Sequence, residues 1–415
     1  MLWISLTKKW KVWKIRLGMQ ELIVVQKQDL KEISILEEGV LKEHYKERED
    51  KKRLEGNIYI GKVTDVLIGM QAAFVDIGAE KNAFLHIRDI LPKKSNVTGN
   101  KKEELENYKI KDYIKPNQKV LVQVKKDSNN IKGARVSTNI QIAGRFVVVL
   151  PENDFITVSQ KIENEEERNR LISIVGSVKK NKKIGIIIRT AAKGKEESKI
   201  KKNIENTLKE LENIQKEFLN SDDKVPKIIK KSDTILEKIL LDIADNKLEK
   251  IYVNNKELQK EIEQILKRLQ EDVTIKVELV EEGLENRYDL NSQIEKISNR
   301  KIWLKCGGFI TIDKTEALTA IDVNSGKFTG KENIEKTALK VNKEASIEIA
   351  KQLRLRDIGG IIIIDYIDMN EESSKEEIIE LLKEKLKEDR AKTQVMEFTK
   401  LSLLEITRKH IFSEE

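Results

Sequence analysis

Five short segments with alternating apolar and polar residues lie between Gly56 and Ile142, and they constrain the fold more than any other feature. In order they are NIYIGKVTDVL, AAFVDIG, NAFLHI, KVLVQVKKD and ARVSTNI, separated by glycine, asparagine and lysine turns. A period of two is the pattern of β-strands, and several short strands in close succession predict a small β-barrel. The polar insert Pro92–Pro116 is predicted to be a long loop.

The segments on either side of the barrel predict further strands and a helix. Residues 20–50 predict short strands followed by HYKEREDKKR, a charged stretch that is typical of a solvated connector. Residues 145–190 predict further strands, in RFVVVL, FITVSQ and IGIIIRT. Apolar residues from Ile200 to Phe218 recur at spacings of three and four, which predicts a helix.

The C-terminal half predicts alternating helices and strands. Residues 232–280 run helix, strand, helix, strand, an order that indicates an α/β unit. Residues 300–415 predict a hairpin-like strand pair, a long helix over Glu332–Arg356, a strand in GGIIIIDYID and a further helix.

The composition of the chain limits the kinds of partner and the cellular compartment that we expect for it. Lys+Arg number 79 against 71 Asp+Glu, and the net charge of +8 favours a polyanionic partner only weakly. Cys306 is the only cysteine, so the chain has no internal disulfide and no zinc site that needs two thiolates. We therefore expect a reducing, cytoplasmic compartment and, because long apolar runs are absent, no membrane span. The basic residues 1–18 are predicted to be an N-terminal extension and not a secretory signal.

The segment TEALTAIDVNSG is the most informative stretch for function. Alternate side chains of a strand share a face, so Thr319, Ile321 and Val323 are predicted to point into a core. Asp322 and Asn324 then point together to the opposite face.

A second aspartate, Asp365, follows the apolar run Ile361–Ile364, which is typical of a strand buried on both faces. A carboxylate at the end of such a strand is costly unless its charge is satisfied, and Mg²⁺ is one partner that does so. The alternative is an ordinary helix cap or turn residue. Two such aspartates, one of them with an asparagine on the same face, favour the metal.

TEALTAIDVNSG, EIAKQLRLRDIGG and IIIIDYIDM resemble the catalytic core signature of the ribonuclease E/G family. The similarity runs from about Tyr288 to Arg408 and extends more weakly back to Met19. It implies that Asp322 and Asp365 hold Mg²⁺ and that Asn324 orients the site, whereas we expect Asp368 to be structural or to lie behind the ligands.

The resemblance also implies a substrate and products. Single-stranded, A/U-rich RNA would be cut to 5′-phosphate and 3′-hydroxyl ends, in ribosomal RNA processing and messenger RNA decay. Two alternatives stay open, namely a non-catalytic RNA-binding or assembly factor and a metal-dependent DNA nuclease.

The fold implied by the resemblance is an α+β multidomain chain. An OB-type β-barrel is inserted in an RNase H-like subdomain and is followed by a 5′-sensor subdomain, and a deoxyribonuclease-I-like α/β domain carries the catalytic site. The implied boundaries are 1–18 for the extension, 19–52 and 229–297 for the RNase H-like parts, 53–140 for the barrel, 141–228 for the sensor and 298–415 for the catalytic domain.

Two phenylalanines of the barrel, Phe74 and Phe84, fall on the polar side of their strands. An OB-type barrel stacks bases on aromatic residues in such positions, although an exposed ring can also close a loop or pack on a neighbouring domain. By the resemblance, Phe74, Phe84 and Lys132 match RNA-contact positions, and Lys126 is a further basic residue nearby. We expect His86 to be a surface histidine.

IIIRTAAKG places Arg189 and Thr190 where an apolar strand ends. A guanidinium fork beside a hydroxyl suits a terminal phosphate, although the residues alone could be ordinary strand-end residues. The resemblance implies a pocket that senses the 5′-monophosphate of RNA, with Gly144 and Val148 contributing.

Arg354 and Arg356 could line an RNA channel or complement the dipole of the helix end. Longer members of the family share zinc between two subunits through a CxxC motif, which this sequence lacks. We therefore expect either a short form or a truncated product, and any homodimer to form without a zinc link.

Overall fold

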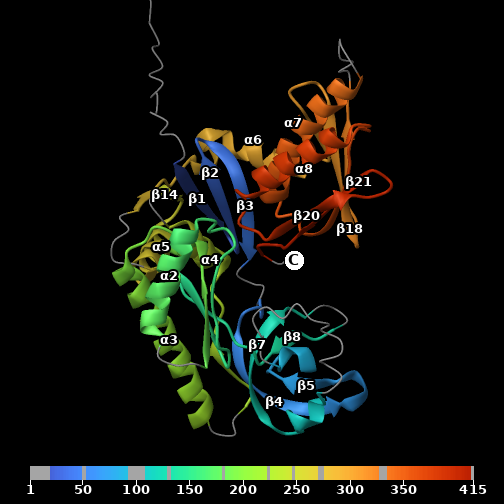
Figure 1. Ribbon diagram of the computed structural model, residues 1–415. Coiled ribbons are helices and arrows are strands. Elements are labelled where there is room, and N and C mark those ends of the chain that lie inside the picture. Colours follow the sequence, from blue (N-terminus) through green and yellow to red (C-terminus); the bar gives the residue numbers. More distant parts are fainter. Residues whose placement is uncertain are drawn as a thin grey trace, which may run out of the picture. The chain divides into compact units, whose positions relative to one another are not determined.

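The computed structural model describes residues 19–48, 53–91, 108–128, 132–179, 183–221, 225–244, 248–269, 275–326 and 334–412. The chain forms two compact units (Figure 1). The first unit combines the chain up to Glu49 with Ile243–Glu415, and the second unit is Asp50–Asp242. Both mix helices and sheets, so the predicted α+β class is confirmed. The predicted extension 1–18 and the insert residues 92–107 lie outside the described residues.

A closed five-stranded barrel begins the second unit. Its strands follow the order β4-β5-β6-β8-β7, and pairing between β4 and β7 closes it. The interior is filled by the alternate apolar residues of these strands, among them Val75, Leu85 and Val122. The predicted barrel is therefore confirmed. The elements are β4 (Ile58–Leu67), β5 (Ala72–Asp76), β6 (Ala83–His86), β7 (Lys119–Lys126) and β8 (Arg135–Ser137), with single turns η1 (Ile68–Met70), η2 (Ile87–Asp89) and η3 (Ile110–Asp112).

The second unit continues with a small sheet, β11-β12-β10-β9, that packs against two helices. The long helix α3 (Glu197–Asn220) confirms the predicted helix, and β13 (Lys227–Lys230) returns to pair with β4. The three strands predicted in 145–190 are confirmed as β10, β11 and β12, but the helix α2 (Glu165–Val178) that lies between β11 and β12 was not predicted. The sequence nevertheless contains the signals for α2. Asn164 caps the N-terminus of the helix, and three glutamates occupy its first turn. The buried residues Leu171, Ile174 and Val175 follow at helical spacing. The remaining elements are β9 (Ile142–Ala143), β10 (Val147–Pro151), β11 (Ile156–Val158), β12 (Ile184–Ile188) and η4 (Thr190–Ala192).

One sheet of the first unit joins segments that are far apart in the sequence. Its order is β15-β14-β1-β2-β3, with β1 parallel to β14 and antiparallel to β2 (Figure 1). The predicted helix–strand alternation over 232–280 is confirmed by α4, β14, α5 and β15. The bounds are β1 (Gln20–Lys27), β2 (Leu30–Glu37), β3 (Val40–Arg48), β14 (Leu248–Val253), β15 (Lys276–Leu279), α4 (Ile235–Ile243) and α5 (Lys256–Leu269).

The prediction that HYKEREDKKR is a solvated connector is wrong for its first half. Strand β3 continues to Arg48, and it buries Tyr45 and the carboxylate of Glu43. Within this half the alternation of the strand places Tyr45 in the core, where its hydroxyl donates to Glu43 just before the stretch, and leaves Lys46 and Arg48 exposed. Residues 49–52 lie outside the described residues.

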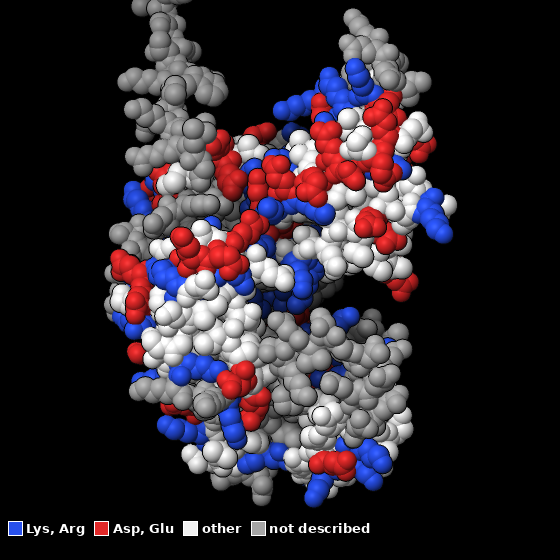
Figure 2. Space-filling view, viewed as in Figure 1, with Lys and Arg blue, Asp and Glu red and all other residues white. Residues whose placement is uncertain are grey.

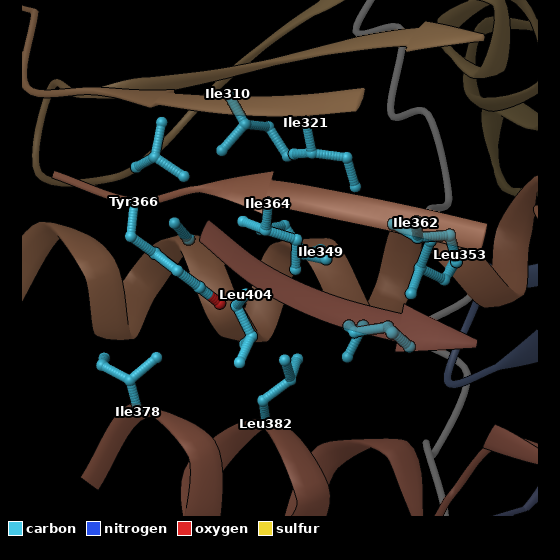
Figure 3. Close-up of a cluster of buried hydrophobic side chains, with 14 of the residues drawn as sticks. Ile310, Ile321, Ile349, Leu353, Ile362, Ile364, Tyr366, Ile378, Leu382 and Leu404 are labelled. Atoms are coloured by element: carbon cyan, nitrogen blue, oxygen red, sulfur yellow. The ribbon is translucent and has the colours of Figure 1, made fainter. Parts of the chain in front are cut away.

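The second sheet of the first unit has the order β16-β17-β18-β19-β21-β20, with β18 parallel to β19. Figure 3 shows how its buried face packs on two helices, with Ile321, Ile364 and Leu404 meeting Ile349 of α7 and Ile378 of α8. The elements are β16 (Lys301–Trp303), β17 (Phe309–Lys314), β18 (Leu318–Asn324), β19 (Gly360–Asp365), β20 (Thr393–Phe398), β21 (Leu403–Arg408), α7 (Ile334–Leu355) and α8 (Glu372–Leu386), preceded by η5 (Leu284–Asp289), α6 (Leu290–Glu295) and η6 (Lys296–Ser298).

Strand β19 is buried on one face only, which corrects the prediction of two buried faces. Ile362 and Ile364 are fully buried, whereas Ile361 is 51% exposed. The helices α7 and α8 pack on the same face, and the opposite face is exposed in the described part of the chain. We call this opposite face, which carries Asp322 and Asp365, the open face. The predicted long helix is confirmed as α7, and the hairpin of β20 and β21 was not predicted.

Across the described ranges, no helix is both long enough and apolar enough to cross a membrane.

Candidate active site

Asp322 and Asp365 lie side by side on the open face. Strands β18 and β19 are parallel neighbours, and their register pairs Asp322 with Asp365. Paired residues of neighbouring strands point to the same face, and such strands lie about 4.8 Å apart. The buried partners Thr319, Ile321 and Val323 confirm the predicted alternation of β18. Two carboxylates separated by more than forty positions in the sequence are thereby brought together.

Asn324 contacts one carboxylate of the pair directly. It lies two residues beyond Asp322 on the same face, and its Nδ2 donates a hydrogen bond of 2.5 Å to Asp322 Oδ2. The orienting role that the resemblance implies for Asn324 stays a prediction, for which this contact provides the geometry.

Like charges meet at this site. Burial raises the pKa of the Asp365 carboxyl, and the negative charges of Asp322 and Asp368 raise it further. In a continuing strand, the side chain of Asp368 would point to the face opposite Asp365. Strand β19 ends at Asp365, so this argument does not apply to Asp368. Asp368 is exposed and lies near enough to act on Asp365, and its role stays a prediction.

Within the described ranges, no lysine, arginine or histidine is paired with the two aspartates. Among the described residues, neither Asp322 nor Asp365 forms an ion pair, and the nearby Arg300 is held by Asp313 through bonds of 2.5 and 2.7 Å. Both aspartates are exposed, so the cost of burying their charges is smaller than the sequence predicted, although partial burial still raises the pKa of Asp365. A bound cation would relieve both the partial burial of the Asp365 carboxylate and its repulsion by the neighbouring carboxylates.

The donor set fits magnesium. Mg²⁺ is usually held by one or two carboxylates and completes its shell with waters and phosphate oxygens. In the described part of the chain, no group of three or more His, Cys, Asp or Glu side chains could hold a metal, whereas catalytic zinc sites use three protein ligands. Asp322 and Asp365 are therefore the residues that could hold Mg²⁺.

The barrel brings its two predicted aromatic residues together. Phe74 on β5 pairs with Phe84 on β6, and the half-buried rings lie 6.1 Å apart between centroids. Lys126 is exposed on β7 and pairs with Arg135, which in turn pairs with Phe84. Lys132 lies two residues before Ala134, whose carbonyl accepts the N–H of Phe84 at 2.7 Å. The predicted aromatic and basic side chains thus belong to one region of the barrel, which also contains Arg135.

His86 has a local structural role, as expected for a surface histidine. Its Nδ1 accepts the N–H of Arg88 at 3.1 Å and caps η2. Burial lowers the pKa of His86, which favours the neutral ring that this hydrogen bond requires.

The four predicted sensor residues lie at one end of the β10–β12 pair. Arg189 Nη1 donates to the carbonyl of Gly144 at 3.0 Å, and Thr190 shares a hydrogen bond of 3.0 Å with Ser159. Val148 lies on β10 opposite Ile187, two residues before Arg189. The structure adds one residue that the sequence did not indicate, because Arg189 Nη2 also forms an ion pair with Asp242.

Arg354 and Arg356 do not form a free basic pair. Arg354 donates through Nε to the buried Glu43 at 2.7 Å, and its side chain is only 11% exposed. Arg356 donates to Gln352 and to the carbonyl of Asn299. The guanidinium of Arg354 already compensates a buried carboxylate. Arg354 is therefore not an exposed residue that could line an RNA channel.

Acidic side chains gather over α8, on the helix-covered side of the second sheet (Figure 2). Exposed glutamates of this helix include Glu372, Glu376 and Glu380. Since like charges repel phosphates, this surface is unsuited to a nucleic acid. Of the two sides of this sheet, the open face is therefore the one that could bind a phosphodiester.

Comparisons with known proteins agree with the sequence motifs. The model of the Ribonuclease E/G family matches residues 141–411. Ribonuclease G of Salmonella typhimurium (strain SL1344) is 37% identical over 388 residues, covering 91% of this chain and 77% of that protein. Ribonuclease G of Haemophilus influenzae is 38% identical over 381 residues, with the same coverage. Ribonuclease E of Synechocystis is 36% identical over 360 residues, covering 85% of this chain and 52% of that protein.

Proposed function

Because this chain belongs to the ribonuclease E/G family, we propose that it is an endoribonuclease that cuts single-stranded RNA with Mg²⁺ held by Asp322 and Asp365. The observation that carries the proposal is the in-register pairing of these two aspartates on the open face, with no ion-pair partner among the described residues. The coarser activity follows from the relatives, which are named Ribonuclease G and Ribonuclease E.

Each residue of the site has a defined task in this proposal. Asn324 holds Asp322 in one orientation through its side-chain amide. Asp322 and Asp365 would together provide the negative charge that holds Mg²⁺. When bound there, Mg²⁺ would stabilise the negative charge that develops on the phosphate oxygens. The open face leaves room for an extended RNA strand, and the products would carry 5′-phosphate and 3′-hydroxyl ends.

We assign the holding of RNA to the barrel. Phe74 and Phe84 present neighbouring rings on which unpaired bases can stack, and Lys126 and Lys132 can bind the phosphates. Stacking accepts any base, so a preference for A/U-rich segments would reflect their lack of pairing. Ribosomal RNA precursors and messenger RNA are the substrates that we propose, which places the activity in the cytoplasm.

A cleavage assay tests the proposed function. The protein is incubated with Mg²⁺ and a 5′-monophosphorylated single-stranded RNA or its DNA equivalent, and the product ends are mapped. We expect cleavage of RNA only, and loss of cleavage when EDTA removes the metal. Binding without cleavage would favour the RNA-binding factor, and cleavage of the DNA would favour the DNA nuclease.

Replacement of Phe84 by alanine is expected to raise the Kd for single-stranded RNA by about tenfold, since stacking on one aromatic ring contributes ~1–3 kcal/mol per base. The catalytic rate at saturating RNA should change little, because Phe84 lies in the barrel and not among the residues of the active site. Fluorescence anisotropy with a labelled RNA measures the Kd. The matched control is Tyr113→Ala, which removes an exposed ring of the same unit outside the Phe74–Phe84 pair. Equal affinity of Phe84→Ala and wild type would remove the barrel assignment.

Replacement of Arg189 by alanine is expected to reduce the preference for 5′-monophosphate over 5′-hydroxyl RNA by about tenfold, the effect of losing charge-assisted hydrogen bonds. Asp242→Asn should increase the preference, because Asp242 competes with the phosphate for the guanidinium. The measurement is kcat/KM on matched RNAs that differ only at the 5′ end. Lys227→Ala removes an exposed charge elsewhere in the second unit and serves as the control. An unchanged preference in Arg189→Ala would exclude the sensor.

A further inference from the structure

Three side chains at the edge of the second sheet form a group that the proposed function does not yet use. Trp303 of β16 is 61% exposed and lies 5.3 Å from Phe309 of β17 between ring centroids, at 63°. The ammonium of Lys301 lies 3.6 Å from the centroid of Phe309 and 4.2 Å from that of Trp303. We call Lys301, Trp303 and Phe309 the aromatic platform.

The aromatic platform is continuous with the candidate active site. Trp303 pairs with Phe309, and Phe309 pairs in turn with Asn324 on the next strand. Residues paired in this way share a face, so the platform lies on the open face together with Asp322. Asn324 touches the carboxylate directly, which leaves one side chain between the rings and Asp322.

Folding alone does not account for these side chains. Over the ranges that the structure describes, Lys301 forms no ion pair and the indole N–H of Trp303 has no hydrogen-bond partner. The adjoining rings of Trp303 and Phe309 form a contiguous aromatic surface beside polar groups, and such a surface is typical of a binding site. The cation–π contacts hold the lysine over the rings and leave its donors available.

We propose that the aromatic platform stacks one unpaired base of the RNA strand next to the bond that is cut, and that Lys301 binds the phosphate of that nucleotide. The combination of an exposed ring and a fixed cation is what proteins use to hold single strands. Close to two carboxylates, the ammonium also offsets the repulsion that a phosphate meets. This inference rests on the proposed function and adds the position of one nucleotide to it.

An abasic scan tests the proposal. A set of 5′-monophosphorylated RNAs carries one abasic nucleotide at successive positions on either side of the cleavage site. For the wild type, we expect kcat/KM to fall by about tenfold at the one position that lies over Trp303. Trp303→Ala should show the same loss with intact RNA and no additional loss at that position. Trp303→Phe, which keeps a ring, should retain most of the activity.

Lysine and control variants complete the test. Lys301→Met should raise KM and weaken its salt dependence with little change in kcat, and Lys301→Arg should restore KM. Ile361→Ala removes another exposed apolar side chain of the open face, at the end of β19 away from Asp365, and should cut like the wild type. Circular dichroism and thermal unfolding establish that every variant is folded.

The outcomes distinguish a failure of the proposed function from a failure of the aromatic platform alone. A wild type that does not cut RNA overturns the proposed function and this inference with it. A wild type that cuts, together with wild-type kcat/KM in Trp303→Ala, overturns the platform alone. The same holds if the losses from Trp303→Ala and from each abasic position simply multiply, because the ring and the base would then act independently.

Discussion

Replacement of Asp365 by asparagine is expected to lower the rate of RNA cleavage by about 10³-fold, while the affinity for RNA stays within about twofold of the wild type. A bound metal contributes several kcal/mol of charge stabilisation, and about 1.4 kcal/mol corresponds to a tenfold change in rate. Asparagine has the size of aspartate but no charge, so the loss reports on the carboxylate and not on packing. We assign the holding of RNA mainly to the barrel, which this substitution leaves intact. Single-turnover cleavage and fluorescence anisotropy measure the two quantities.

Asp313→Asn is the matched control for this prediction. Asp313 lies on the neighbouring strand β17, on the same open face, but its carboxylate is bound by Arg300 and it pairs with Ala320 in the sheet. We expect a change in cleavage rate of less than about threefold, the effect of one exposed ion pair. Equal rates for Asp365→Asn and wild type would show that the catalytic carboxylates lie elsewhere.

Replacement of Glu43 by glutamine is expected to lower the free energy of unfolding by about 3–5 kcal/mol, because it leaves two arginines beside an uncharged group in the interior. Glu43 is fully buried. It accepts hydrogen bonds from Arg354 at 2.7 Å, from Tyr45 at 2.8 Å and from Arg390. Chemical denaturation at neutral pH measures the change. Glu380→Gln breaks an exposed ion pair with Lys383 and should cost less than about 0.5 kcal/mol.

The same cluster predicts a dependence of stability on pH. Burial alone would raise the pKa of the Glu43 carboxyl, but the charges of Arg390 and Arg354 and their hydrogen bonds hold it at about 2. A carboxyl with a lowered pKa stabilises the fold above its ordinary value of 4.5, and this contribution is lost as the pH falls toward 2. The wild type should therefore lose stability over this window more steeply than Glu43→Gln. Parallel pH profiles of the two proteins would contradict the role of Glu43.

Local periodicity was sufficient to predict the parts of the fold that depend on neighbours in the sequence. The alternation in TEALTAIDVNSG places Asp322 and Asn324 on the face opposite Ile321, as the structure has them. The barrel and α3 follow from the same kind of pattern. The missed helix α2 also had local signals, in the cap at Asn164 and the apolar spacing after it, so that error was avoidable.

Contacts between distant segments could not be predicted in this way. Glu43 looks solvated until Arg354 and Arg390 reach it from more than three hundred residues away. The ion pair of Arg189 with Asp242 is of the same kind. The run Ile361–Ile364 is equally apolar on both sides, and only the placement of α7 and α8 on one face of the sheet decides which isoleucines are buried.

Binding of Mn²⁺, followed by electron paramagnetic resonance as a substitute for Mg²⁺, tests most directly whether Asp322 and Asp365 share one ion, since both metals favour carboxylate oxygens. The wild type and Asp313→Asn are predicted to bind one Mn²⁺ that Mg²⁺ displaces, and the double variant Asp322→Asn/Asp365→Asn is predicted to lose this ion. Retention of the same displaceable ion by the double variant would contradict the account.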